Sequence, residues 1–157
     1  MGRKHVSSDE VAKTVYNSNP PTSGQHVETW VKPGIYTEPQ REGQLIHSLE
    51  HGYVNINYNC NPLTPGINDA TLSAQMQVAP AGAVNDTKEC KTLIQDLTDI
   101  AKKKKLFKLL VVPYSQLDAR IALTAWDHVD KFNDFDAKRI EAFIDYWRDH
   151  GPEQTME

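Results

Sequence analysis

The sequence predicts an α+β fold: a small mixed β-sheet, two helices packed on it, and a long irregular arm at the N-terminus. Three observations predict this fold. The first 45 residues contain prolines and glycines but little periodicity, three later stretches have the pattern of strands, and two longer ones repeat apolar residues at helical spacing. A chain of 157 residues is long enough to bury one core, so residues 1–157 are expected to form a single domain.

The irregular arm, residues 1–45, is predicted from its turns. The two prolines within residues 19–24 exclude a helix there, and residues 32–34 (Lys-Pro-Gly) mark a second turn. A segment of this kind becomes ordered only by lying across other elements. Its polar residues are therefore candidates for a functional site.

The first regular elements follow the arm. Residues 44–51 suit two short helical turns that end at Gly52, a C-terminal cap. Residues 53–58 alternate as a strand does, which places the apolar residues of this stretch on one face and its two asparagines on the other.

The second half of the chain carries the remaining predicted elements. Residues 91–104 form an amphipathic helix, and residues 106–114 form a buried strand. Residues 120–126 form another strand, and the short connection between these two strands suits a hairpin. Asp136 caps a last helix whose apolar stripe, which includes Phe143 and Trp147, is expected in the core.

The two cysteines, Cys60 and Cys90, bracket a loop insertion, residues 60–90, rich in Pro, Gly, Asn and Ala. A disulfide between them would suit an oxidising compartment. Two unrelated buried thiols are the alternative.

The charge and hydropathy of the chain indicate whether nucleic acid or a membrane is a partner. A net charge of −4 argues against a general nucleic-acid binder. The basic run at residues 102–105 is expected to be solvated lysine at a helix C-terminus; a phosphate-binding or membrane patch is the alternative. The sequence contains neither an apolar run long enough to span a bilayer nor a signal peptide, so the chain is expected to be soluble, or to be the soluble part of an anchored protein.

A histidine-rich segment is the best candidate for chemistry. His47 and His51 are one helical turn apart, so both imidazoles face one side and can share a metal ion. Glu50 lies between them, either to orient an imidazole or to act as a base toward a metal-bound water. His26, on the rigid arm, adds a third imidazole, and His5 is a fourth ligand or an outer neighbour.

Several properties of this segment limit what it can do. Imidazole suits zinc, copper, iron or nickel rather than calcium or magnesium. The His-x-x-Glu-His string resembles the pattern of inverted zinc peptidases, but Gly52 ends the helix earlier than those enzymes require. His47 and His51 could also serve only as a helix cap and a core residue. His128 is expected on a surface loop, and His150 at the end of the last helix.

The chain resembles the bacterial family called domain of unknown function 3105. The resemblance is carried by residues 16–26 and 45–52, and further by residues 2–6, 121–126, 143–144 and 151–153. It implies that His5, His26, His47 and His51 belong to the family motif. It also implies an extracytoplasmic domain, periplasmic or at the cell surface, whose contact with the membrane runs only through an N-terminal anchor removed from this chain.

Three functions follow as hypotheses. The first is an extracytoplasmic domain that binds copper, with zinc second, through His5, His26, His47 and His51. The second is a metal-dependent hydrolase or oxidase that uses Glu50 as its base. The third is a metal-free binding module in which the histidines are structural.

Overall fold

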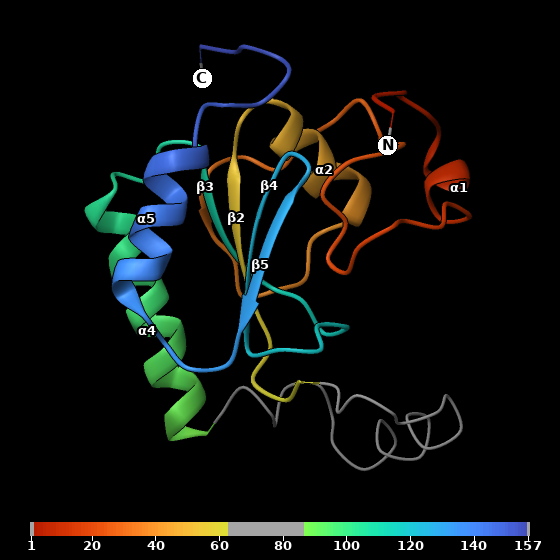
Figure 1. The fold of residues 1–157 in the computed structure, drawn as a ribbon. Helices are drawn as coiled ribbons and strands as arrows, with labels where there is room; N and C mark the ends of the chain where they lie inside the picture. The colour runs from red at the N-terminus through yellow and green to blue at the C-terminus, as the bar shows by residue number, and fades with distance from the viewer. Residues whose placement is uncertain (1, 63–86, 157) are drawn as a thin grey trace, which may run out of the picture.

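The computed structural model describes residues 2–62 and 87–156, and most of the predicted loop insertion lies outside these described residues. The predicted α+β class is confirmed, because a five-stranded mixed sheet carries helices on its faces (Figure 1). The elements are α1 (Ser8–Val11), β1 (Gly34–Ile35), α2 (Glu42–Glu50), β2 (Val54–Tyr58), α4 (Lys88–Lys103), β3 (Leu109–Pro113), β4 (Ile121–Ala125), β5 (His128–Phe132) and α5 (Ala137–Trp147).

Strand order corrects one prediction. The sheet runs β1-β3-β2-β4-β5, so β2 lies between the two strands that were expected to form a hairpin. Ile56 of β2 faces Val111 of parallel β3 on one side and Leu123 of antiparallel β4 on the other. The connection between β3 and β4 is long enough to cross one intervening strand, a distance of about 10 Å. Its length therefore does not tell whether β3 and β4 are adjacent in the sheet.

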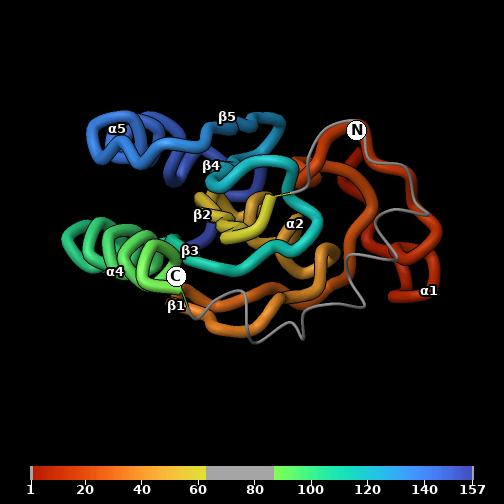
Figure 2. The backbone as a smooth tube through the Cα atoms, turned by 90° about the horizontal axis from the view of Figure 1, so that it is seen from below, coloured from red at the N-terminus to blue at the C-terminus, as the bar shows by residue number. Residues whose placement is uncertain are grey.

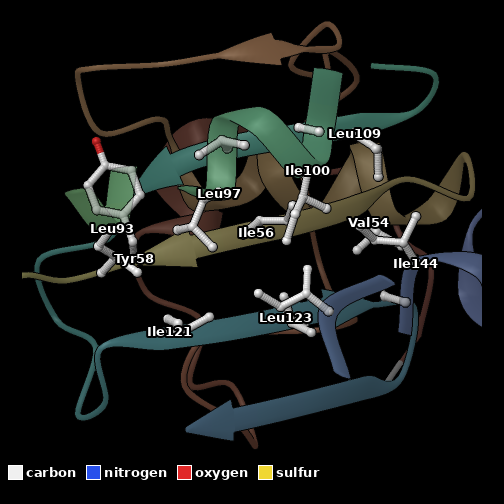
Figure 3. Packing of buried hydrophobic residues seen from close by; sticks show 14 residues of the cluster. Val54, Ile56, Tyr58, Leu93, Leu97, Ile100, Leu109, Ile121, Leu123 and Ile144 are labelled. Carbon is white, nitrogen blue, oxygen red and sulfur yellow. The ribbon is translucent and has the colours of Figure 1, made fainter. Parts of the chain in front are cut away.

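The sheet is covered on both faces. Helices α4 and α5 cover one face, whereas α2 and the N-terminal arm cover the other (Figure 2). The main core lies under α4 and α5, where Leu97 and Ile144 meet the apolar side chains of β2, β3 and β4 (Figure 3). A smaller core, which includes Leu45 and Leu110, lies on the α2 side.

The asparagine face of β2 is buried as well, although its alternation matches the prediction. Asn55 donates a hydrogen bond to the carbonyl oxygen of Leu45 at 3.3 Å, and Asn57 donates one to that of Ala122 at 3.1 Å. These bonds let amide side chains lie beneath α2 at a lower desolvation cost.

Two strands differ from the sequence-based prediction: β5 was not predicted, and β3 was predicted to begin too early. Strand β5 was not predicted because its five residues, His-Val-Asp-Lys-Phe, are mostly polar and do not alternate with apolar ones. His128 therefore lies in a strand and stacks on Trp147, with ring centroids 3.5 Å apart, rather than on a loop. Strand β3 begins three residues later than expected, since Lys105, Leu106 and Lys108 have φ values of 62°, 55° and 48°, which β-strands do not adopt.

The disulfide between Cys60 and Cys90 is confirmed, which excludes the alternative of two unrelated thiols. It joins the chain just after β2 to the first turn of α4. The basic run lies at the C-terminus of α4, as predicted, but two of its lysines are not simply solvated. Lys103 pairs with Glu141 at 2.8 Å and Lys104, whose side chain is 17% exposed, pairs with Asp145 at 2.7 Å, so the run ties α4 to α5. Among the described residues, no helix has the length and hydropathy to cross a bilayer.

Candidate metal centre

The end of helix α2 sets the position of His51. Gly52 has a φ of 83°, and its amide donates to the carbonyl oxygen of Leu49 at 2.9 Å. The next amide, that of Tyr53, donates to the carbonyl oxygen of Ser48 at 3.0 Å. This pair of bonds is a Schellman motif, which a glycine in the left-handed region permits. His51 is thus the last residue before the turn, and its side chain stays beside the helix.

The N-terminal arm delivers two further histidines. His5 and His26 form a single parallel bridge, in which the amide of Val6 donates to the carbonyl oxygen of His26 at 2.8 Å. The amide of His26 donates in turn to the carbonyl oxygen of Lys4 at 3.2 Å. Two backbone bonds therefore hold the start of the chain against the arm. The imidazole of His26 is fully buried, whereas the side chain of His5 is 41% exposed.

The arm and helix α2 bring three imidazoles together. The ring centroid of His5 lies 4.8 Å from those of His26 and His47, and the latter two are 5.1 Å apart. One ring nitrogen of each histidine lies within 4.8 Å of the others. The exposed imidazole of His5 leaves this group open to solvent on one side, which gives an ion a path of entry.

Backbone carbonyls orient the two buried imidazoles. His26 donates from Nδ1 to the carbonyl oxygen of Gly24 at 2.7 Å, and His47 donates from Nδ1 to that of Val27 at 2.6 Å. A carbonyl oxygen only accepts, so each neutral ring carries its proton on Nδ1 and a lone pair on Nε2. This is the arrangement by which outer partners prepare a histidine to bind a metal.

A buried carboxylate faces these imidazoles. Oε2 of Glu50 lies 2.9 Å from Nε2 of His26 and 3.6 Å from Nε2 of His5, and the Glu50 side chain is only 4% exposed. Arg3 approaches the other carboxylate oxygen at 3.9 Å. A lone pair on Nε2 of His26 would be repelled by the Glu50 carboxylate unless a proton or a cation lay between the two atoms. The space between Glu50 and these imidazoles therefore favours a positively charged group, either a proton or a metal ion.

The pKa of the His47 imidazole is lowered from its ordinary value, mainly because burial penalises the charged ring. The hydrogen bond to Val27 opposes this effect, and the neighbouring His51, His26 and His5 add to it. The neutral ring is the form that binds a metal, so His47 keeps its ligating form to lower pH than an exposed histidine does.

His51 lies on the far side of His47. Its Nε2 is 3.0 Å from Nε2 of His47 and 3.6 Å from Oε2 of Glu153 in the C-terminal tail. The four histidines selected from the sequence thus form two groups that share His47: one with His5 and His26, the other with His51 and Glu153.

Three residues at this centre were missed by sequence reasoning. Trp30 covers His51 and His47 with ring centroids 4.7 and 5.5 Å away, and neither Arg3 nor Glu153 was recognised. Arg3 stands two residues before His5 and Trp30 four residues after His26, but both pairs lie in the arm, where no strand or helix was predicted, so the spacing did not single them out. The signal that could have found Arg3 and Glu153 was their place in residues 2–6 and 151–153, two of the stretches that carry the family resemblance.

The other two histidines serve elsewhere. His128 stacks on Trp147, and His150 donates to the carbonyl oxygen of Tyr146 at 2.6 Å, just beyond the end of α5. The latter contact agrees with the predicted place of His150 at a helix C-terminus.

No curated protein and no solved structure matches the chain. One family model does match, over residues 5–84 and 81–157, and its description reads "Protein of unknown function (DUF3105)". These two matches take in the arm from residue 5, the sheet, and helices α2, α4 and α5. They also contain the histidine cluster, which we define as His5, His26, His47, Glu50, His51 and Glu153, whereas Arg3 lies before them. The chain therefore belongs to the DUF3105 family.

Proposed function

We propose that this protein binds a single transition-metal ion through its histidine cluster, with copper ahead of zinc, outside the cytoplasm. One observation carries the proposal. Backbone carbonyls hold a proton on Nδ1 of His26 and of His47, which leaves their Nε2 atoms to bind an ion, and a ring nitrogen of His5 lies beside them. At His26 the ion would displace the proton that lies between Nε2 and the Glu50 carboxylate. Glu50 adds negative charge to the same location.

The donor set supports a transition metal. Imidazole nitrogens bind copper and zinc, whereas calcium and magnesium prefer oxygen. Tetrahedral ligation at about 2 Å needs nitrogens about 3.3 Å apart, and the present nitrogens lie within 4.8 Å of one another. The half-exposed imidazole of His5 is the one with room to move inward.

The choice of copper and of compartment is supported by the cysteines. Both cysteines are in the disulfide, so no thiolate is left to ligate zinc in a structural site. Disulfides persist in oxidising compartments such as the periplasm and the cell surface. A thiolate-free cluster of histidines in such a compartment suits copper.

The two alternatives are less well supported. A metal-free module was expected to have histidines that bond to the backbone and lie far apart. His26 and His47 do bond to backbone carbonyls, but their rings are only 5.1 Å apart. A hydrolase or oxidase was expected to have a cleft beside the site. Two pockets of the described residues contain none of the four histidines or Glu50 in their lining: one is lined by Lys4, Gly24 and Gln25, the neighbours of His5 and His26, and the other lies near Phe135.

The test is metal binding by the purified chain. The protein is isolated without chelator and assayed for copper and zinc, then stripped and titrated with Cu(II), Zn(II), Ca(II) and Mg(II) by calorimetry. We expect one Cu(II) or Zn(II) ion per chain and no heat from Ca(II) or Mg(II). A stripped, folded protein that binds neither Cu(II) nor Zn(II) would contradict the proposal.

The Glu50→Gln variant tests the role of the buried carboxylate. Glutamine keeps the shape of the side chain but removes the charge opposite His26, so we expect metal affinity to fall by about 10- to 100-fold. Calorimetric titration with Cu(II) measures this change, and Glu38→Gln, an exposed acid on the arm, is the matched control. If the variant binds Cu(II) as tightly as the wild type, the Glu50 charge does not stabilise the bound ion. That result would fit the alternative in which Glu50 serves only as a catalytic base.

A further inference from the structure

We propose that the centre contains a second, alternative position for the metal ion, formed by His47, His51 and Glu153. This inference rests on the proposed function, because it concerns where the bound ion sits. The first position is formed by His5, His26 and His47. Since both positions use His47, one ion occupies either the first position or the second.

At the second position, two of the three separations between donor atoms are already close to those of a bound ion, and all three are within 4.8 Å. Nε2 of His47 and Nε2 of His51 are 3.0 Å apart, and Oε2 of Glu153 lies 3.6 Å from the latter. These separations lie on either side of the roughly 3.3 Å that tetrahedral ligation needs. In the metal-free protein a proton lies between the two nitrogens, donated by His51 because Nδ1 of His47 holds the proton of that ring. An ion would take the place of that proton.

Glu153 is held at the centre by the backbone around it. Its amide donates to the carbonyl oxygen of Glu50 at 3.0 Å, which ties the tail to the end of α2. A Cβ on Gly151 would lie 2.2 Å from the same carbonyl oxygen and 2.2 Å from the amide nitrogen of Gly52. Only a glycine at position 151 lets the tail approach the end of α2 so closely, so this contact depends on Gly151.

A buried lysine secures the rest of the tail. Nζ of Lys108 bonds to a carboxylate oxygen of Asp149 at 2.6 Å and to the carbonyl oxygen of Thr155 at 2.8 Å. Its side chain is fully buried, so breaking either contact exposes a charge to an apolar surrounding. Glu153 lies between these two anchors and stays near His51.

Only one nitrogen of His47 is available. Its Nδ1 donates to the carbonyl oxygen of Val27 at 2.6 Å, which leaves Nε2 for either position. Both positions cannot be filled through that one atom. Each has its own carboxylate, Glu50 beside the first and Glu153 in the second, so the charge of the ion is balanced in either place. An ion in either position would therefore be bound by the same Nε2 of His47.

The experiment compares three proteins by Cu(II) titration and by electron paramagnetic resonance: His5→Ala, His5→Ala/Glu153→Gln, and the control His5→Ala/Glu38→Gln. Loss of the His5 imidazole weakens the first position, so the ion moves to the second. We expect His5→Ala to bind one Cu(II) with a spectrum that shows fewer nitrogen ligands than the wild type. Adding Glu153→Gln should then weaken binding by about tenfold or more, while the control should not.

The outcomes separate this inference from the proposed function. If the wild type binds no Cu(II) or Zn(II), the proposed function fails. If the wild type binds one ion but Glu153→Gln has no effect in the His5→Ala background, the second position alone is refuted. Two ions bound per wild-type chain would refute the sharing of His47.

Discussion

Replacing His47 by asparagine should abolish metal binding, with an affinity loss larger than the 10- to 100-fold typical of outer partners. His47 is the one residue common to both metal positions, and only its Nε2 is available to an ion. Asparagine places an amide nitrogen where Nδ1 lies, so the hydrogen bond to the Val27 carbonyl can persist. The substitution removes Nε2 and leaves the rest of the contact in place.

The measurement is the shift in melting temperature on adding Cu(II). An ion at 100 times its dissociation constant stabilises the folded state by about 2.7 kcal/mol. We expect this shift in the wild type and in the control His150→Ala, whose imidazole lies beyond the end of α5. It should be absent in His47→Asn. Because the shift compares one protein with and without the ion, a general loss of stability in the variant does not affect it. An undiminished shift in His47→Asn would show that the ion binds elsewhere.

Removing the disulfide should lower the free energy of unfolding by about 3–4 kcal/mol, the chain-entropy value for a loop of this length. The bridge closes a sequence separation of 30 residues and joins the end of β2 to α4. We expect the Cys60→Ala/Cys90→Ala variant to unfold at markedly lower urea concentration with a native-like fold. The wild type under reductant serves as the control, because it loses the same bond without losing side-chain volume. Equal urea midpoints for the variant and the oxidised wild type would contradict this prediction.

Local patterns predicted the elements whose cause is local. Helix α4 follows from apolar residues at helical spacing, the end of α2 follows from Gly52, and the disulfide follows from two cysteines around one insertion. The predicted hairpin was wrong because the neighbours of a strand depend on the whole sheet, and β2 lies between β3 and β4. Strand β5 was missed because a short edge strand made mostly of polar residues differs little from a loop in its sequence.

The same division holds at the histidine cluster. The sequence alone determined that His47 and His51 share a helix face, because helical spacing sets that relation within one turn. It also selected His5 and His26, through the rigid arm and the family resemblance. Only the tertiary structure decided that His5 and His26 lie on one side of His47 and that Glu153 lies with His51 on the other.

The physical reason is the range of the interactions. Helical spacing acts over four residues, whereas the cluster depends on the bridge between His5 and His26 and on the close contact of Gly151 with the end of α2. The first contact joins the start of the chain to a later part of the arm, and the second joins the C-terminal tail to the end of α2. They form only when the sheet and its covering layers are in place, so no stretch of sequence contains them.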